Sequence, residues 1–371
     1  MRLITMLYLL FFFSITNADG GFSINVFEDE ADKQFIDQTI NQFMQRYGIP
    51  GLSIAIAKQD EILFAKGYGF ADTNKKVPVN IIHKFRLASL SKPITSAAIM
   101  KLMEEGKLKL DDKVFGKGGI LHRRFPTKNK FLHQITIRHL LEHTAGKNWT
   151  NDGGDPMFQD YSLSQTNLIR KTLKENPITT APGKSYAYSN FGYCLLGRVI
   201  EELSGIPYES YVRKTFFKDI GANSFSIGNK TPSKAITQVH YFPDTSESPY
   251  SFPIKRMDSH GGWISNAIDL VKFINSVDGL GEDVLSQESI KIMTTPSKHN
   301  PNYALGWNVN QYNNWWHLGL LPGTASIMVR TEQGYSWAVL LNKRSEDSSF
   351  GAELDKLSWN LIAGIKELNK E

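Results

Sequence analysis

Apolar residues recur at helical spacing near the N-terminal end of the chain. Residues 31–47 predict an amphipathic helix, whose apolar positions are Phe35, Ile36, Ile40, Phe43 and Met44. The sequence "GIPG" (48–51) ends this helix. Two apolar runs follow, "LSIAIAK" (52–58) and "EILFAKGYG" (61–69), with only Gln59 and Asp60 between them. These runs predict a β-hairpin with a tight turn.

The apolar pattern becomes helical from Ser89 onward. A strongly apolar helix, buried on most sides, is predicted there from Ile94, Ala97, Ala98, Met100, Leu102 and Met103. Helices and loops then predominate from residue 105 to about 253. The clearest helices are "TIRHLLEHTAG" (136–146) and "NFGYCLLGRVIEELSG" (190–205), each of which ends in glycine.

The final third returns to strands. A turn leading into a helix is predicted at residues 261–277 and a last helix at roughly 351–368; the predicted strands between them are 303–310, 315–319, 324–330 and 336–343. Because two isolated hairpins would be marginally stable, strands from both parts of the chain are expected to share one sheet. The predicted fold class is α+β: an antiparallel sheet flanked by helices from both chain ends, with an inserted, mostly helical subdomain at roughly 105–255.

The first segment has the pattern of a targeting sequence. Residues 1–18, "MRLITMLYLLFFFSITNA", carry Arg2 followed by an uncharged apolar run that is too short to span a bilayer comfortably. Thr16 and Ala18 would suit a cleavage site. We interpret residues 1–18 as a signal peptide and residues 19–371 as a secreted, extracellular domain. If the segment were retained, it would tether the same domain to a membrane.

Composition narrows the classes of partner. The formal net charge is +5, and lysines and arginines are interspersed with acids. This pattern indicates a solvated surface, so neither nucleic acid nor, after signal cleavage, a membrane is expected as a partner. The single cysteine, Cys194, lies in an apolar helical run and is expected to be a buried, unpaired thiol. Asn148 begins an acceptable glycosylation sequon.

The stretch "RLASLSKPITS" (86–96) carries the first candidate chemistry. Ser89 and Lys92 are three residues apart and would share one helix face, which Ser91 and Lys92 would not. A serine at a helix N-terminus sits among free backbone N–H groups that favour a developing oxyanion. Pro93 is tolerated in a first turn. Desolvation by the apolar helix would lower the lysine pKa, so that the neutral amine could accept the Ser89 proton.

Further polar groups occur in two later stretches. "AYSNFG" (187–192) supplies Tyr188 and Asn190, and "WWHLGLLPG" (315–323) supplies His317 and Gly319 on a predicted strand. Taken singly, each would be explained by packing, helix capping or an ordinary strand position, just as a capping serine beside a surface lysine would explain the first pair.

Two histidines have a spacing seen in metal sites. His139 and His143 stand at i and i+4 of a predicted helix. No third ligand suggests itself in the sequence, so we assign them no function.

In this order, the three motifs resemble the serine β-lactamase and penicillin-binding protein superfamily. They fit its class C-like branch, which includes D-aminopeptidases, D,D-carboxypeptidases, family VIII-type esterases and the animal LACTB-like proteins. In that branch the second motif is Tyr-x-Asn, and the third is Lys-Thr-Gly or His-x-Gly. The resemblance covers roughly residues 32–365, including "HLLEHTAG", "GGWISNAIDL" and "YALGW". It implies a β-lactamase/transpeptidase-like fold.

The resemblance also implies roles for the motif residues. Ser89 would be the acylated nucleophile, Lys92 would help to deprotonate it, and Tyr188 would shuttle protons and activate the deacylating water. Tyr188 would act either as a hydrogen-bonded phenol or as a phenolate, and the phenolate would require cations such as Lys92 to lower its pKa. Asn190 would hydrogen-bond Lys92 and the substrate amide, and the N–H groups of Ser89 and Leu320 would form an oxyanion hole. Such chemistry needs no metal or other cofactor.

The third motif departs from the lysine form. His317 stands where β-lactamases and penicillin-binding proteins usually carry a lysine that faces a substrate carboxylate. A mostly neutral histidine is a weaker carboxylate partner. The resemblance therefore favours a serine hydrolase for small esters, amides or short peptides, with His317 and Gly319 in its substrate site. Two alternatives stay open: a non-catalytic protein that keeps the fold for binding or assembly, and a true penicillin-recognising enzyme.

Apolar residues follow the third motif. The sequence "LLP" (320–322) predicts an apolar acyl or leaving-group pocket. Four tryptophans could line the same cleft, although burial in an aromatic core is the default interpretation: Trp149, Trp263, Trp315 and Trp316.

Overall fold

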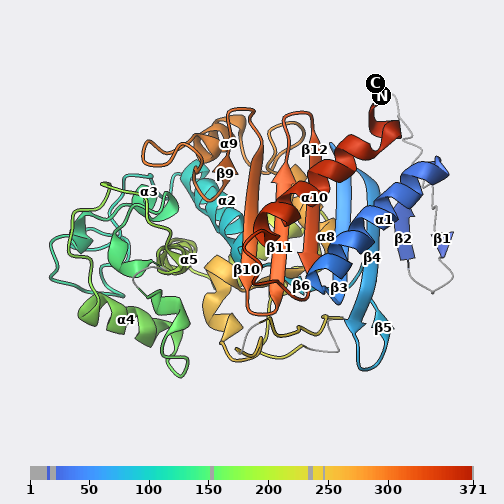
Figure 1. The fold of residues 1–371 in the computed structure, drawn as a ribbon. Coiled ribbons are helices and arrows are strands. Elements are labelled where there is room, and N and C mark those ends of the chain that lie inside the picture. The colour runs from blue at the N-terminus through green and yellow to red at the C-terminus, as the bar shows by residue number, and fades with distance from the viewer. Residues whose placement is uncertain (1–14, 17–21, 151–153, 233–236, 245–246, 370–371) are drawn as a thin grey trace, which may run out of the picture.

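An antiparallel sheet built from both parts of the chain forms the centre of the computed structural model, which describes residues 15–16, 22–150, 154–232, 237–244 and 247–369. Its strand order is β1-β2-β4-β3-β12-β11-β10-β9, and β5 pairs with β4 (Figure 1). The strands are β1 (Ile15–Thr16), β2 (Phe22–Asn25), β3 (Gly51–Lys58), β4 (Glu61–Asp72), β5 (Val77–Pro78), β9 (Asn308–Val309), β10 (Trp315–Leu321), β11 (Thr324–Arg330) and β12 (Tyr335–Leu341). The expected α+β fold with one shared sheet is confirmed.

Helices cover both faces of this sheet. α1 (Glu30–Tyr47) and α10 (Phe350–Gly364), from opposite ends of the chain, cross one face (Figure 1). α2 (Ser91–Glu104) and α8 (Ala267–Asn275) belong to the core on the other face. Along β3, Ile54 and Ile56 enter the first core, whereas Ala55 and Ala57 enter the second. The two-residue period of the strand therefore feeds two apolar layers.

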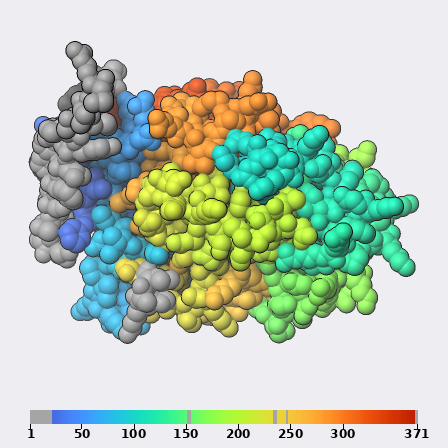
Figure 2. Space-filling model, turned by 180° about the vertical axis from the view of Figure 1, so that it is seen from behind, coloured from blue at the N-terminus to red at the C-terminus, as the bar shows by residue number. Residues whose placement is uncertain are grey.

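The inserted subdomain lies beside the sheet and is mostly helical, as expected (Figure 1). Its helices are α3 (Ile137–Leu141), α4 (Gln165–Glu175), α5 (Asn190–Ser204) and α6 (Tyr208–Val212), followed by a π-helical turn over Arg213–Phe217. Viewed from behind, the segment around α6 covers the middle of the molecule (yellow-green in Figure 2). The strand β7 (Ser226–Ile227) was not predicted; it joins a second, small sheet with β6 (Phe85–Arg86) and β8 (Trp263–Ser265), in the order β6-β8-β7.

Several predicted boundaries are wrong. The helix expected at 136–146 ends with Leu141, because the chain turns away at His143, whose φ is 57°. The strand expected at 303–310 is reduced to β9, since Gly306 has a φ of 86° and lies against Ser96 of α2. Two further helices were not predicted: α7 (Asp258–Gly261) and α9 (Gln287–Thr294).

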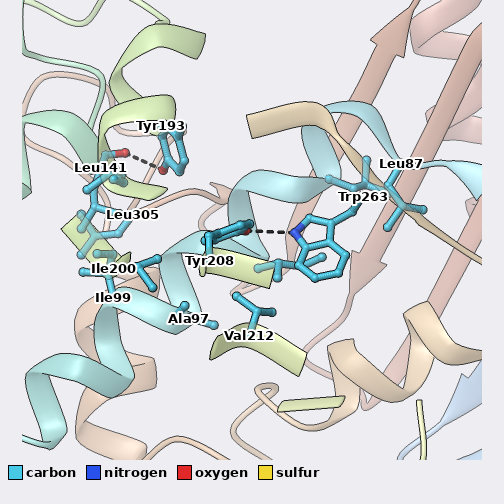
Figure 3. Packing of buried hydrophobic residues seen from close by; sticks show 14 of the residues in the cluster. Leu87, Ala97, Ile99, Leu141, Tyr193, Ile200, Tyr208, Val212, Trp263 and Leu305 are labelled. Atoms are coloured by element: carbon cyan, nitrogen blue, oxygen red, sulfur yellow. Dashed lines mark hydrogen bonds between the residues drawn. The ribbon is translucent and has the colours of Figure 1, made fainter. Parts of the chain in front are cut away.

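Three of the four tryptophans that could have lined a cleft belong to the core. Trp149 and Trp263 are fully buried and Trp315 is 4% exposed. The indole N–H of Trp263 donates to the hydroxyl of Tyr208 at 2.9 Å (Figure 3). The default interpretation of these three residues as aromatic core is therefore confirmed. Cys194 is a buried free thiol, as predicted.

Candidate active site

Ser89 lies in a short 3₁₀ turn, η1 (Ala88–Leu90), and α2 begins only at Ser91. The helix was expected to start at Ser89 itself. The preceding residue, Ala88, has a φ of 50°, an unusual conformation for alanine that places the serine on a sharp turn. Ser89 is half-buried, whereas Lys92 is fully buried. The Nζ atom of Lys92 lies 3.0 Å from Ser89 Oγ, so the predicted pairing across one turn is present.

Lys92 has three polar neighbours. Besides Ser89 Oγ, its Nζ atom contacts Asn190 Oδ1 at 2.7 Å and the backbone carbonyl of His260 at 2.9 Å. Burial lowers the pKa of Lys92 to about 7, against an opposing effect of the nearby Asp155 charge. The two carbonyl oxygens can only accept, so they take the two N–H groups of a neutral amine. Its lone pair then faces the Ser89 hydroxyl.

Tyr188 brings a second group to the nucleophile. Its hydroxyl donates to Ser89 Oγ at 3.0 Å, and its ring centre lies 4.7 Å from Lys92 Nζ. Burial raises the pKa of Tyr188 well above its usual value, and the hydrogen bond to Ser89 opposes this only partly. Of the two forms expected for Tyr188, the phenolate would need a lowered pKa, so the raised pKa favours the hydrogen-bonded phenol. Tyr188 is a neutral phenol that donates a proton in a hydrogen bond.

Asn190, the first residue of α5, connects the lysine to a carboxylate that the motifs did not indicate. Its Oδ1 accepts from Lys92, as expected, and its Nδ2 donates to Asp155 Oδ2 at 2.5 Å. Asp155 is 6% exposed and caps a short 3₁₀ helix, η5 (Pro156–Phe158). In the sequence, Asp-Pro indicates only a turn or helix start. No local pattern links it to a residue 35 positions away.

His317, on strand β10, lies on the sheet side of Tyr188, with 6.5 Å between the ring centres. It is 3% exposed, and its Nδ1–H donates to the carbonyl of Leu318 at 2.8 Å. Burial, with the Lys92 charge, lowers the pKa of His317 to about 3. The imidazole is therefore neutral, as predicted, and its Nε2 is free to accept. The Tyr303 hydroxyl lies 3.4 Å from this atom.

His143, to which the sequence analysis assigned no function, packs beside the group of site residues. Its Nδ1 accepts the backbone N–H of Ser189 at 3.0 Å, so the ring proton sits on Nε2 and is donated to Tyr303 Oη at 3.0 Å. The ring of His143 lies 4.3 Å from that of Tyr188, centre to centre. Since burial lowers its pKa well below the usual value, His143 is a neutral packing partner of Tyr188.

Gly319 allows β10 to approach the nucleophile turn. A Cβ atom there would lie 2.4 Å from the Leu87 carbonyl and 2.3 Å from Ser326 Oγ. Next to it, the Leu320 side chain is 41% exposed. The expected oxyanion hole from the N–H groups of Ser89 and Leu320 stays a prediction.

Apolar residues lie beside the nucleophile turn. Leu321 is buried in a small cluster together with Ala88, Phe252, Ile254 and Met257. Phe158 and Tyr161, which are partly exposed, pack against this cluster. Within the described ranges of the chain, no group of three or more His, Cys, Asp or Glu side chains could hold a metal ion.

Comparison with known proteins gives consistent relatives. The chain is 28% identical over 329 residues to Protein flp of Staphylococcus aureus strain N315, which covers 85% of this chain but 64% of that protein's length. It is 27% identical to the putative penicillin-binding protein PbpX of Bacillus subtilis, over 86% of this chain and 77% of the relative. The chain thus spans just under two thirds of the length of Protein flp.

Solved structures share the fold. The D-amino acid amidase from Ochrobactrum anthropi SV3 superimposes with a TM-score of 0.76 at 23% identity, over 91% of this chain and all of the amidase. The octameric penicillin-binding protein homologue from Pyrococcus abyssi gives 0.73 at 24%, over 90% and 78% of the two chains. The model of the Beta-lactamase family matches residues 36–357. The chain therefore belongs to the Beta-lactamase family, whose fold and serine hydrolase chemistry the motifs had predicted.

Proposed function

We propose that this chain is a secreted serine hydrolase that forms an acyl-enzyme on Ser89 and acts on small esters, amides or short peptides. The observation that carries the proposal is the double contact of Ser89 Oγ, which lies 3.0 Å from both Lys92 Nζ and Tyr188 Oη. A base and a proton donor thus meet the same hydroxyl. This complete arrangement also argues against a protein that keeps the fold only for binding or assembly.

Acylation follows from the protonation states at the site. Neutral Lys92 takes the Ser89 proton as Oγ attacks the substrate carbonyl carbon. The oxygen of the tetrahedral intermediate would be held by the N–H groups of Ser89 and Leu320. As the bond to the leaving group breaks, the leaving group takes a proton from Tyr188, which regains one from the Lys92 ammonium. The acyl group remains as an ester on Ser89.

Deacylation reverses these proton movements with water. Tyr188 and Lys92 again lie next to the reacting oxygen and can remove a proton from the attacking water. The C–O bond to Ser89 then breaks, and Oγ recovers a proton. The acyl group leaves as the carboxylic acid product.

The surroundings of Ser89 favour a neutral, apolar acyl group. His317 is uncharged near neutral pH and cannot pair with a carboxylate as a lysine would. Phe158 and Tyr161, which are partly exposed, pack against the apolar cluster that contains Ala88. Both features favour an ester or amide substrate without a carboxylate next to the reacting bond over a penicillin-like substrate. The fold likeness to a D-amino acid amidase makes amino acid amides a reasonable part of a substrate panel.

Secretion rests on the sequence alone. The part of the chain that the structure describes holds no helix with the length and apolar character needed to cross a membrane. Of the expected signal peptide, only β1 (Ile15–Thr16) lies within the described residues. Asn148, the expected glycosylation site, donates its side-chain amide to the Pro177 carbonyl at 2.9 Å. N-terminal sequencing and glycosidase treatment of the secreted protein would test both expectations.

A labelling experiment tests the central claim. The purified protein is treated with a fluorophosphonate probe and with a chromogenic short-chain ester, beside Ser89→Ala. Ser348→Ala, at an exposed serine, serves as the matched control. We expect labelling of the peptide that contains Ser89, and turnover in the wild type and control only. Labelling that persists in Ser89→Ala, or an inert wild type, contradicts the proposed function.

A further inference from the structure

Asp155 points a buried carboxylate into the group of catalytic residues without touching the nucleophile. Its side chain is 6% exposed. Oδ2 accepts from Asn190 Nδ2 at 2.5 Å, and Oδ1 accepts from the Met157 backbone N–H at 2.9 Å. Burial raises the pKa of Asp155, and the two hydrogen bonds and the Lys92 charge oppose this by favouring the ionised carboxylate. A capping role for η5 explains the second contact but leaves the first unexplained.

The first contact determines which way the Asn190 amide faces. An amide can turn over and exchange its oxygen with its nitrogen, so its orientation depends on its partners. Asp155 as a carboxylate can only accept, and Lys92 in any state offers N–H groups. With Asp155 in place, Asn190 must direct Nδ2 towards the carboxylate and Oδ1 towards Lys92. Without that carboxylate, nothing fixes the orientation of the Asn190 amide, and its contact with Lys92 Nζ is no longer held in place.

The charge of Asp155 acts on the same lysine. It raises the pKa of Lys92 and so opposes the larger, lowering effect of burial. The other titratable groups around this amine are Tyr188, Tyr193, His143, His260 and His317. Burial keeps all five neutral near pH 7, since it raises the pKa of both tyrosines and lowers that of the three histidines. Asp155 thus supplies the negative charge that this buried amine senses.

We propose that Asp155 is a positioning residue: through Asn190 it holds Lys92 Nζ against Ser89 Oγ, and its negative charge sets how readily that amine binds a proton. The expected effect of Asp155 on the rate of Ser89 acylation rests on the proposed function. The effect of Asp155 on the pKa of Lys92 does not depend on turnover. The pKa of Lys92 and the acylation rate can therefore be measured separately.

Direct titration of Lys92 tests the assignment without any substrate. Lysines are labelled with ¹³C at Cε, the Lys92 resonance is identified by its loss in Lys92→Arg, and its midpoint is followed against pH by NMR. Removal of the charge in Asp155→Asn should move the midpoint to lower pH. Asp155→Ser should do the same while retaining a residue that can cap η5. Asp269→Asn is the matched control, because Asp269 is 7% exposed, accepts a backbone N–H from Ser224, and belongs to α8 away from the site.

Kinetics provide the second measurement. The rate of Ser89 acylation, normalised to the folded fraction, should fall about 10²-fold in Asp155→Asn, the scale expected from a small misplacement of a catalytic group. In the pH profile of Asp155→Asn, the rise in acylation rate on the acidic side (the acidic limb) should move to lower pH. Asp155→Glu keeps the charge, so its limb should stay near that of the wild type even where its rate falls. On an Asn190→Ala background, Asp155→Asn should cost little further rate, because the path through Asn190 is already broken.

The outcomes separate the two proposals. An unmoved or raised Lys92 midpoint in both Asp155→Asn and Asp155→Ser overturns the assignment and leaves Asp155 as a helix cap. Fully additive losses in the double variant overturn the path through Asn190. If the midpoint moves as expected but Ser89 in the wild type is never acylated, the proposed function fails while the role of Asp155 towards Lys92 stands.

Discussion

Tyr188 donates its hydroxyl hydrogen to the oxygen of Ser89 at 3.0 Å, although the two residues are 99 positions apart. The tyrosine stands just before α5, and the serine stands in the turn before α2. Packing of these two helices therefore sets the distance between nucleophile and phenol. The first and second motifs, which are far apart in the sequence, therefore meet at one place in the fold.

Replacement of this phenol tests its chemical role. Tyr188→Phe keeps the ring against His143 but removes the proton donor. We expect kcat for an ester to fall by about 10²-fold or more, the usual contribution of a positioned acid or base, with an unchanged circular dichroism spectrum. Tyr186→Phe is the control, because Tyr186 also packs against His143 without a contact to Ser89. Equal losses in the two variants would contradict the assigned role.

The pH dependence of acylation follows from Lys92. Burial lowers its pKa to about 7 in the folded protein, and the amine accepts a proton only when it is neutral. Activity should therefore be low below pH 7 and rise with pH through that pKa. A pH profile of kcat/KM for an ester without ionisable groups measures this limb. A rate that falls as pH rises from 6 to 8 would contradict neutral Lys92 as the base.

Much of the fold could be predicted because its apolar pattern is local. The hairpin of β3 and β4, the strands β10 to β12 and the terminal helices α1 and α10 all show their own periodicity. β8 and β7 are short and gain their pairing only from neighbours distant in sequence, so no local pattern marks them. The shortened α3 has the same cause, since Gly183 and Ala187 donate to the carbonyls of Thr144 and His143 just beyond it.

The candidate site shows the same division. Ser89 and Lys92 share one turn, so their pairing could be derived from spacing. Tyr188, Asn190 and His317 could be chosen only through the family resemblance. Asp155 and His143 meet the site through contacts across the fold, to Asn190 Nδ2 and to the Ser189 N–H. The sequence left open whether Tyr188 acts as a phenolate or as a phenol, because the burial that raises its pKa depends on the whole fold.

Gly319 offers a test of how closely β10 must approach the nucleophile turn. A methyl group at this position would meet the Leu87 carbonyl and Ser326 Oγ at less than van der Waals distance. Gly319→Ala should lower the free energy of unfolding by about 1–3 kcal/mol, as overpacking usually does, and should reduce acylation. Gly351→Ala in α10 is the control, since a Cβ there meets only Leu318 at 3.6 Å. Urea denaturation of both variants measures the difference, and equal stability would contradict the tight approach.

The neutral state of His317 leads to a prediction about substrate choice. The ring is 3% exposed, it donates to the Leu318 carbonyl, and burial lowers its pKa to about 3. A lysine at this position would supply the positive charge that the histidine lacks. In His317→Lys, the ratio of kcat/KM for a carboxylate-bearing ester to that for its neutral amide analogue should rise by about tenfold, since a hydrogen bond to a charged group contributes roughly 1.5–3 kcal/mol.

The matched control for this substitution is His317→Gln, which changes the side chain but adds no charge. Its ratio should stay near that of the wild type, while nitrocefin hydrolysis, measured in parallel, should increase only in His317→Lys. The Tyr303 hydroxyl lies 3.4 Å from His317 Nε2 and could accept from the new ammonium group. An unchanged ratio in a folded His317→Lys protein would mean that carboxylate discrimination does not depend on the charge at this position. The specificity would then have to arise from the apolar cluster around Leu321 and Met257.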